Sequence, residues 1–266
     1  MKIFIKFFRI LLRYLIASNN LGILNTLKII KLKFNSTNVE NIFKTKKFGK
    51  IHWRNKLDTG VISHFYSKQI NINTYGEKPK LILDIGANIG IETLRFNYLY
   101  PDSKIISLEP ERNNYNLLKK NTTGKKNIIP VNKALWNTID TLSIENYSNL
   151  NSQTFRVNKK NNEKDIISTT TLKSLILEYE INQIDILKID IEGSEAQIFD
   201  GNAIEWLENV KVIILECPDN DAPFTSMKIY KSLLKCNLKF KTYINGENFV
   251  FISEICNWRP EYITLY

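Results

Sequence analysis

The clearest sign of a ligand-binding site in this sequence is a pair of glycines. They lie four residues apart and directly follow an apolar run. The apolar residues 81–83 predict the end of a buried strand, and Asp84 follows them. Gly86 and Gly90 permit the positive φ angles and the close backbone approach of a tight turn, and a helical pattern comes next. A strand, a glycine turn and a helix in this order predict a cofactor turn with the Asp84 carboxylate beside the ligand.

The turn lacks the features that hold a pyrophosphate. A dinucleotide fingerprint has a glycine where this chain has Asn88, and no Gly-Lys pair follows as in a phosphate-binding loop. Glu109 ends a second apolar run about 20 residues after the glycines, which is the place of an acid that binds a ribose. A ribose acid without a phosphate cradle predicts a nucleoside cofactor, and S-adenosylmethionine fits. The alternative is that these residues form a strand ending in a tight glycine turn and have no role in binding.

A third strand, predicted over residues 127–131, leads to Ala134, where main-chain groups would lie beside the adenine. A plain strand terminus is the alternative at this position. The predicted cofactor-binding residues are Asp84, Gly86, Asn88, Gly90, Glu109 and Ala134.

A second block of charges stands within the apolar stretch 184–191 and just after it. The two-residue period of a strand puts Lys188, Asp190 and Glu192 on one side, although a buried parallel strand should be apolar on both faces. These three are the predicted catalytic residues, because Asp190 or Glu192 could receive a proton from a substrate hydroxyl. A structural ion pair between Lys188 and Asp190 is the alternative. No tight ligand motif is present here, so no metal is predicted.

The elements that must position these residues alternate from residue 81 onward. Alternating strands and helices predict an α/β fold with a doubly wound, mostly parallel sheet, in which ligands bind at the carboxyl ends of the strands. Residues 140–157 predict a hairpin-like insertion that would cover this edge. Residues 238–244 and 248–252, separated by an Asn-Gly turn, predict a closing antiparallel hairpin.

The net charge of +10 is concentrated in residues 1–58, which contain thirteen Lys and Arg against two acidic residues. Within residues 1–16 the basic side chains follow a helical spacing along an otherwise apolar surface, which predicts an amphipathic helix. Its charges recur too often for a membrane span or a signal peptide. Residues 1–34 could lie on an anionic membrane or dock on protein. Contact with nucleic acid is a weaker option, because the aromatic side chains lie on the apolar face.

The composition, with 43% hydrophobic and 24% charged residues, is that of a globular protein. We predict a basic amphipathic helical arm over residues 1–58 and one domain over residues 59–266. The three cysteines are widely spaced, which supports neither a disulfide framework nor a zinc site and indicates a reducing, cytoplasmic compartment.

Together these motifs resemble the FkbM-type S-adenosylmethionine-dependent methyltransferases. The segments that carry the resemblance are residues 83–90, 108–110, 132–135, 171–172 and 187–195. The resemblance implies a class I methyltransferase fold, which is Rossmann-like, and methyl transfer to a hydroxyl oxygen of a sugar or a natural product. Members often have an acidic residue after the Thr-Leu step, where this chain has Lys173, and this departure leaves the substrate open.

We therefore predict an S-adenosylmethionine-dependent methyltransferase that acts on a sugar hydroxyl of a glycan or glycolipid. Two alternatives remain open. One is an RNA methyltransferase that uses the basic arm on phosphates, and the other is a non-catalytic, membrane-associated adaptor on a methyltransferase fold. The predicted location is the cytoplasm, with peripheral contact at the inner face of the membrane through residues 1–34 as an option. The sequence leaves the oligomeric state open.

Overall fold

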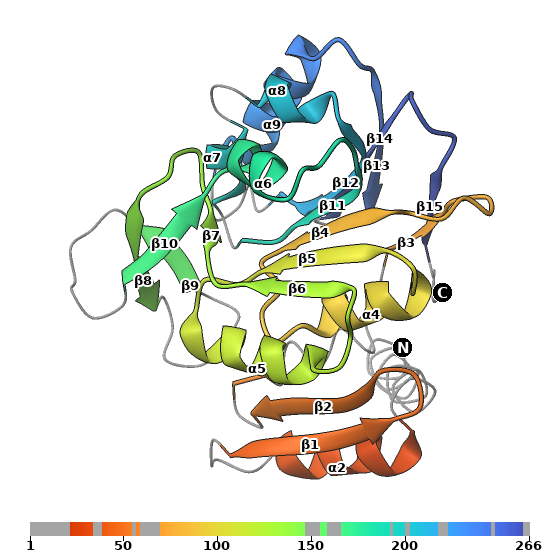
Figure 1. Ribbon diagram of the computed structural model, residues 1–266, viewed down its shortest axis with the longest axis vertical. Coiled ribbons are helices and arrows are strands. Elements are labelled where there is room, and N and C mark those ends of the chain that lie inside the picture. The colour runs from red at the N-terminus through yellow and green to blue at the C-terminus, as the bar shows by residue number, and fades with distance from the viewer. Residues whose placement is uncertain are drawn as a thin grey trace, which may run out of the picture.

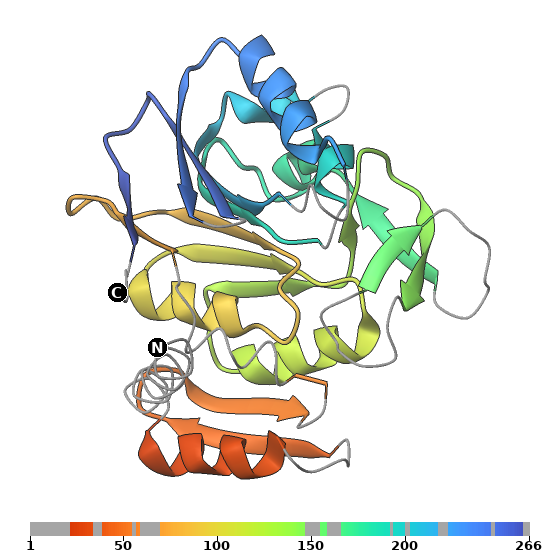
Figure 2. The ribbon, with the colours of Figure 1, turned by 180° about the vertical axis from the view of Figure 1, so that it is seen from behind.

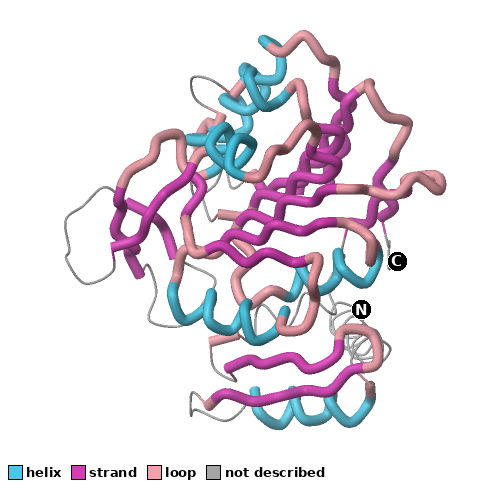
Figure 3. The backbone as a smooth tube through the Cα atoms, viewed as in Figure 1, coloured by secondary structure: helices cyan, strands magenta, loops and turns pink. Residues whose placement is uncertain are grey.

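A seven-stranded sheet forms the centre of the molecule, with helices on both of its faces (Figure 1 and Figure 3). The structure is a computed structural model. It describes residues 22–33, 39–54, 57–58, 70–146, 155–158, 166–191, 194–199, 203–217, 223–245 and 248–262.

The order of the strands in this sheet is β13-β14-β12-β11-β4-β5-β6. The strands are β4 (Leu81–Ile85), β5 (Lys104–Leu108), β6 (Ile128–Val131), β11 (Ile184–Ile189), β12 (Val210–Glu216), β13 (Phe240–Asn245) and β14 (Asn248–Ser253). The five strands from β6 to β12 are parallel, and β14 is antiparallel to both neighbours. The predicted doubly wound sheet with its closing antiparallel hairpin is confirmed. Chain order reverses between β4 and β11, so the switch point where ligands bind lies at their carboxyl ends.

The two faces of the sheet are covered by different sets of helices, as Figure 1 and the view from behind in Figure 2 show. One face carries α4 (Ile91–Leu99) and α5 (Arg112–Thr122). The other carries α6 (Leu172–Glu178), α7 (Glu195–Ile198), α8 (Ile204–Leu207) and α9 (Thr225–Lys235).

The central strand β4 is buried on both faces, as a parallel strand between helices must be. Leu83 and Ile85 belong to the cluster under α6 to α9, while Ile82 packs with Phe96 of α4 on the opposite face. Because side chains alternate along a strand, Asp84 shares the face of Ile82. The sheet therefore holds a carboxylate inside an apolar layer close to its carboxyl edge.

A four-stranded sheet follows directly from the carboxyl end of β6. It is built in the order β7-β10-β8-β9, from β7 (Ala134–Leu135), β8 (Thr141–Asn146), β9 (Phe155–Asn158) and β10 (Ile166–Thr170). Strands β8 and β9 pair in antiparallel register, which confirms the hairpin-like insertion predicted over residues 140–157. Because β7 begins three residues after β6 ends, this sheet lies at the edge where the candidate site is expected.

A separate β-hairpin packs against the side of the body formed by α4 and α5. Strands β1 (Glu40–Thr45) and β2 (Gly49–Arg54) pair in antiparallel register, and α2 (Ile23–Lys33) lies on the outer side of the hairpin (Figure 2). Phe43 and Trp53 stack with their ring centroids 4.9 Å apart and join a buried cluster with Ile91 and Leu117. The sequence analysis did not anticipate this hairpin, because its two strands contribute only one and two buried positions.

The amphipathic helix predicted for residues 1–16 lies outside the described residues. A further pair of strands, β3 (Ile70–Asn73) and β15 (Arg259–Tyr262), forms a small antiparallel sheet that was not predicted.

We expect Phe43→Ala to lower the free energy of unfolding by about 3–5 kcal/mol, because the fully buried ring leaves a cavity between the hairpin and the body. The control is Ile42→Ala at the neighbouring, half-exposed position, which should change the stability by no more than about 0.5 kcal/mol. Urea denaturation followed by circular dichroism measures both. Equal values for the two variants would mean that the hairpin does not stabilise the body.

Candidate active site

The glycine turn after β4 is shaped by the crowding of two strand ends. Gly86 has a φ of 78° and Gly90 a φ of 89°, values that side chains rarely allow, so both predicted turn glycines have the expected conformation. A Cβ on residue 86 would lie 1.8 Å from the main-chain oxygen of Asp190. The Asp190 N–H donates to the Ile85 carbonyl at 3.0 Å. The ends of β4 and β11 are therefore in direct contact, in keeping with the prediction of a mostly parallel sheet whose strands share one carboxyl edge.

Asn88 occupies the middle of the turn with a φ of 50°. Asparagine tolerates this left-handed conformation better than most residues, and the Asn88 Oδ1 accepts a hydrogen bond from the N–H of Ile89 at 2.8 Å. The N–H of Asn88 donates to Glu109 Oε2 at 2.8 Å. The turn is thus fastened to the end of β5 through the acid that was predicted to bind the ribose.

Glu109 is buried, with 5% of its surface exposed, and both of its carboxylate oxygens accept hydrogen bonds. Besides the bond from Asn88, Oε1 accepts from the N–H of Glu111 at 2.9 Å and lies 3.5 Å from Asn114 Nδ2. Burial raises the pKa of Glu109 to about 7, and the hydrogen bonds from Glu111 and Asn88 oppose this shift. Each carboxylate oxygen has two lone pairs, and the hydrogen bonds from Asn88, Glu111 and Asn114 use three of the four, so Oε2 retains one acceptor position for a ribose hydroxyl. The residues at this position fit a nucleoside cofactor.

Asn132 connects Glu109 to the next strand end. Its Nδ2 donates to the carbonyl oxygens of Glu109 at 2.8 Å and Pro110 at 2.9 Å. Ala134 follows in β7 and is buried, with its backbone in parallel register with Thr169 of β10. The contact between Ala134 and an adenine stays a prediction.

Asp84 is fully buried beside Lys188, on the face of the sheet that α4 covers. Its Oδ2 lies 2.6 Å from the hydroxyl of Thr93, while Oδ1 has no hydrogen bond and lies 3.6 Å from Lys188 Nζ. Burial raises the pKa of Asp84, and the Lys188 charge opposes that shift. Because none of its surface is exposed, Asp84 acts on the site through Lys188 in this geometry, and its predicted contact with the cofactor stays a prediction.

Lys188 lies between two carboxylates. Its Nζ is 3.1 Å from Asp190 Oδ2, in addition to the contact with Asp84. Although burial opposes the positive charge, Asp190 and Asp84 together raise the pKa of Lys188 above its usual value. Lys188 therefore remains an ammonium group and cannot serve as a base. The ion pair that was considered as a structural alternative is present, and it also orients the Asp190 carboxylate.

Asp190 is partly exposed at this edge, with 20% of its side chain accessible, and its catalytic role stays a prediction. The third predicted catalytic residue, Glu192, lies outside the described residues. Within the described ranges, no group of three or more His, Cys, Asp and Glu side chains is arranged to hold a metal ion.

The sequence analysis missed a chain of side chains that links Glu109 to the N-terminal hairpin. Arg54 at the end of β2 binds the fully buried Asp58 with Nε at 3.0 Å and Nη2 at 2.7 Å. The same Nη2 donates a short hydrogen bond to Asn114 Oδ1, and Asn114 in turn faces Glu109. Asn114 is placed by the N-cap of α5, where the Glu111 carboxylate accepts from its main-chain N–H. No local motif in the sequence marks the contact between Arg54 and Asn114, because these two residues are 60 positions apart.

The sequence matches the Methyltransferase FkbM domain over residues 84–240, more than half of the chain. It is 24% identical over 168 residues to methyltransferase sdnD of Sordaria araneosa, a match that covers 51% of this chain and 65% of that protein. It is 23% identical over 208 residues to Methyltransferase 1 of Beauveria bassiana (strain ARSEF 2860), where 70% of this chain and 78% of that protein are covered. Both relatives are methyltransferases by name, and neither name states an acceptor.

Among solved structures, an O-methyltransferase from Bacillus cereus in complex with SAH is 14% identical. The match covers 66% of this chain and 74% of that chain, with a TM-score of 0.39.

We expect the affinity for S-adenosylmethionine to rise about tenfold between pH 6 and pH 8, because a ribose hydroxyl donates to the ionised form of Glu109 and its pKa in the free protein is about 7. Glu109→Gln has no charge to titrate, so its affinity should be weaker and nearly independent of pH. Isothermal titration calorimetry across this range measures both.

Glu178→Gln is the control, since this exposed glutamate lies on α6 and should leave the wild-type pH dependence intact. If Glu109→Gln retained the same pH dependence as the wild type, Glu109 would not be the acid that binds the ribose.

Proposed function

The chain belongs to the FkbM methyltransferase domain family, and from this premise we propose that it methylates a sugar hydroxyl of a glycan or glycolipid. Methyltransferase activity with S-adenosylmethionine as methyl donor follows from the family. The acceptor and the methylated atom are the parts that we infer.

The observation that carries this proposal is the pairing of two carboxylates around one glycine turn. Glu109 is buried and fixed by main-chain N–H groups on one side of the turn, whereas Asp190 is partly exposed on the other. A buried acid suits a cofactor that stays in place, and an accessible acid suits a substrate hydroxyl that must enter and leave. The turn between them has no glycine at position 88 for a pyrophosphate.

S-adenosylmethionine supplies a methyl group on a positively charged sulfur, which an acceptor oxygen takes by displacement. Glu109 would hold the ribose, so that the reacting groups are aligned, an effect that can lower a barrier by about 7–11 kcal/mol. Lys188 binds Asp190 Oδ2, and we assign the other oxygen, Oδ1, to the acceptor hydroxyl. Asp190 then receives the hydroxyl proton as the oxygen forms its new bond, which contributes about 10²- to 10⁴-fold to the rate.

We expect Asp190→Asn to retain cofactor binding and to lose turnover by about 10²- to 10⁴-fold, because asparagine keeps the size of the side chain but cannot accept the proton. Calorimetry measures the binding, and transfer of a labelled methyl group measures the turnover. Asp102→Asn, an exposed aspartate paired with Lys78, is the control and should change neither quantity. Wild-type turnover in Asp190→Asn would reduce Asp190 to a structural partner of Lys188.

One experiment distinguishes the proposed function from its two alternatives, the RNA methyltransferase and the non-catalytic adaptor. The full chain is incubated with methyl-labelled cofactor and with separate glycan, glycolipid and RNA fractions. Label in the glycan or glycolipid fraction is the expected result. Label in RNA, with a steep dependence on salt, would support the RNA methyltransferase instead. Binding to vesicles without label in any fraction, and without cofactor binding, would support the non-catalytic adaptor.

A contact with lipid is a second part of the proposal, and α2 supports it. Asn25 donates to Lys44 of the hairpin at 2.8 Å and Thr26 is buried, so this side of α2 faces the protein. The opposite side presents Ile23, Leu24 and Leu27, which are 67%, 83% and 57% exposed. An apolar outer face within a segment rich in Lys and Arg suits the interface of an anionic membrane. None of the helices that the structure describes has the length and apolar character to span a bilayer.

We expect the protein to float with anionic vesicles. The double variant Leu24→Glu with Leu27→Glu should bind them at least about 100-fold more weakly, since each buried leucine contributes about 1.5–3 kcal/mol. The matched control is Leu234→Glu, an equally exposed leucine on α9, which should float like the wild type. Equal binding of the double variant would show that α2 does not contact lipid.

A further inference from the structure

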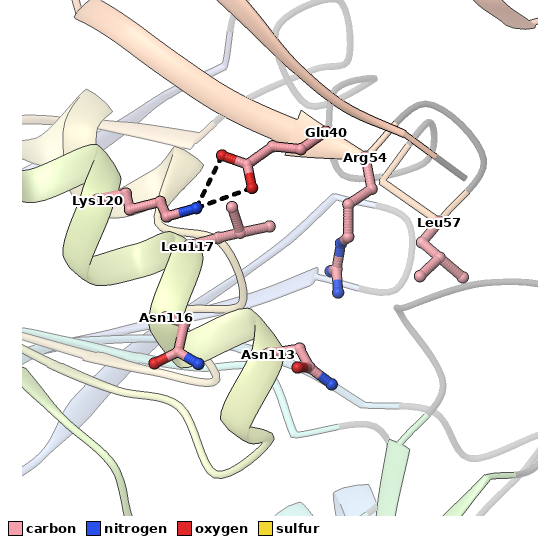
Figure 4. A pocket seen from close by; sticks show the side chains of 7 residues that line it. All are labelled: Glu40, Arg54, Leu57, Asn113, Asn116, Leu117 and Lys120. Carbon is pink, nitrogen blue, oxygen red and sulfur yellow. Dashed lines mark hydrogen bonds and ion pairs between the residues drawn. The ribbon is translucent and has the colours of Figure 1, made fainter. Parts of the chain in front are cut away.

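A pocket of about 440 Å³ lies between the N-terminal hairpin and α5 (Figure 4). Its lining includes Glu40, Arg54 and Leu57 from the hairpin side and Asn113, Asn116, Leu117 and Lys120 from α5. The volume falls within the range of about 300–1,000 Å³ that small-molecule sites occupy. None of these residues belongs to the cofactor turn or to the predicted catalytic set.

The charges that line this pocket are already compensated by neighbours. Lys120 Nζ contacts Glu40 Oε1 at 2.9 Å and Oε2 at 2.8 Å, as the dashed lines in Figure 4 show. The hydrogen bond from Lys120 lowers the pKa of Glu40, which therefore stays ionised. Arg54 is paired with the fully buried Asp58. The charged side chains among the described lining residues are thus all paired, so they offer an ionic ligand no uncompensated charge.

The hydrogen-bonding groups of the lining nevertheless differ in kind. Glu40 offers only acceptors, Arg54 and Lys120 offer only donors, and the amide of Asn116 offers both. The Asn116 side chain is exposed and makes no hydrogen bond with the described residues. A hydroxyl group donates and accepts at the same atom, so adjacent hydroxyls can satisfy neighbouring donors and acceptors. The partly exposed side chain of Leu57 adds an apolar contact for the C–H face of a ring, whereas Leu117 is largely buried in the core.

The pocket and the cofactor acid share one helix. Along the first turn of α5, Asn113 lines the pocket while its neighbour Asn114 lies 3.5 Å from Glu109 Oε1. Arg54, which also lines the pocket, bonds to Asn114. A ligand in the pocket would therefore lie on the outer side of the residues that hold Glu109.

We propose that this pocket between the hairpin and α5 is a subsite for an uncharged, hydroxyl-rich ring of the acceptor, a sugar unit beyond the one that is methylated. The inference rests on the proposed function for the identity of the acceptor, but its test does not require turnover. It assigns a binding role to the hairpin that precedes the matched family domain.

Saturation-transfer NMR of the full chain with methyl glycosides of glucose, galactose, mannose and N-acetylglucosamine tests this subsite directly. We expect transfer to at least one glycoside at millimolar concentration, and chemical-shift changes at the amides of residues 113 and 116. Inorganic phosphate is the comparison probe. Binding of phosphate at these amides without binding of any glycoside would overturn the assignment to an uncharged ring, and so would the absence of any glycoside signal.

Asn116→Trp should fill the pocket from an exposed helix position, and Asn116→Leu should remove the amide without filling it. We expect the first variant to abolish glycoside binding and the second to weaken it, with cofactor affinity unchanged in both. The matched control is Lys119→Trp, an exposed position on the same helix outside the pocket lining, which should bind glycosides like the wild type. Unchanged glycoside binding in Asn116→Trp would place the sugar elsewhere.

The two proposals fail in different ways. If glycosides bind and Asn116→Trp blocks them, while no glycan or glycolipid fraction becomes methylated, the subsite stands and the proposed acceptor is wrong. If a glycan is methylated with the same KM by the wild type and Asn116→Trp, the proposed function stands and the subsite is wrong. When both hold, we expect Asn116→Trp to raise the KM for the glycan about tenfold or more while kcat changes little.

Discussion

The approach of residue 86 to the main-chain oxygen of Asp190 is the contact on which the site depends. A side chain on residue 86 would collide with that oxygen, so only glycine lets β4 and β11 end side by side. Their adjacency brings the Lys188 ammonium within reach of Asp84 on the neighbouring strand, while Asp190 lies two residues from Lys188 along the same segment. A wider separation of the two strands would leave the fully buried Asp84 without its cation, which is costly in the interior of a protein. Gly86 therefore permits charge contacts within the protein, and these contacts position the groups that would meet a ligand.

The buried charges at this edge are compensated unequally, and the difference fits their roles. Lys188 has two carboxylates and keeps its charge, whereas Glu109 has only N–H donors and its pKa rises to about 7 because it is buried. Its pKa in the folded protein lies above the unfolded value of 4.5. The stability that Glu109 contributes is therefore fully present below pH 4.5 and is lost as the pH rises through about 7. A ligand that donates hydrogen bonds to the ionised acid offsets this loss, which is what a cofactor ribose would do.

The sequence predicted the parts of this structure that depend on local pattern. The strand and turn around Gly86, the place of Glu109 and the contact between the ends of β4 and β11 follow from apolar runs, glycine spacing and the rules of parallel sheets. The hairpin at residues 40–54 could not be predicted in this way, since its few apolar positions become a core only against α4 and α5. The hydrogen bond from Arg54 to Asn114 could not be predicted either, because only tertiary folding brings these two residues together.

The unpredicted part also shows how cofactor and acceptor contacts can be divided between segments. The turn, Glu109 and Asp190 all lie within residues 84–240, which match the family, whereas Arg54 and the hairpin precede that range. Helix α5 stands between the two, with Asn114 toward Glu109 and Asn113 toward the hairpin. A change in the hairpin can therefore alter the pocket without moving the end of β5, because Glu109 is held independently by the N–H groups of the turn and of Glu111. If the proposed subsite is correct, the matched domain would bind the methyl donor while the preceding hairpin would contact an outer ring of the acceptor.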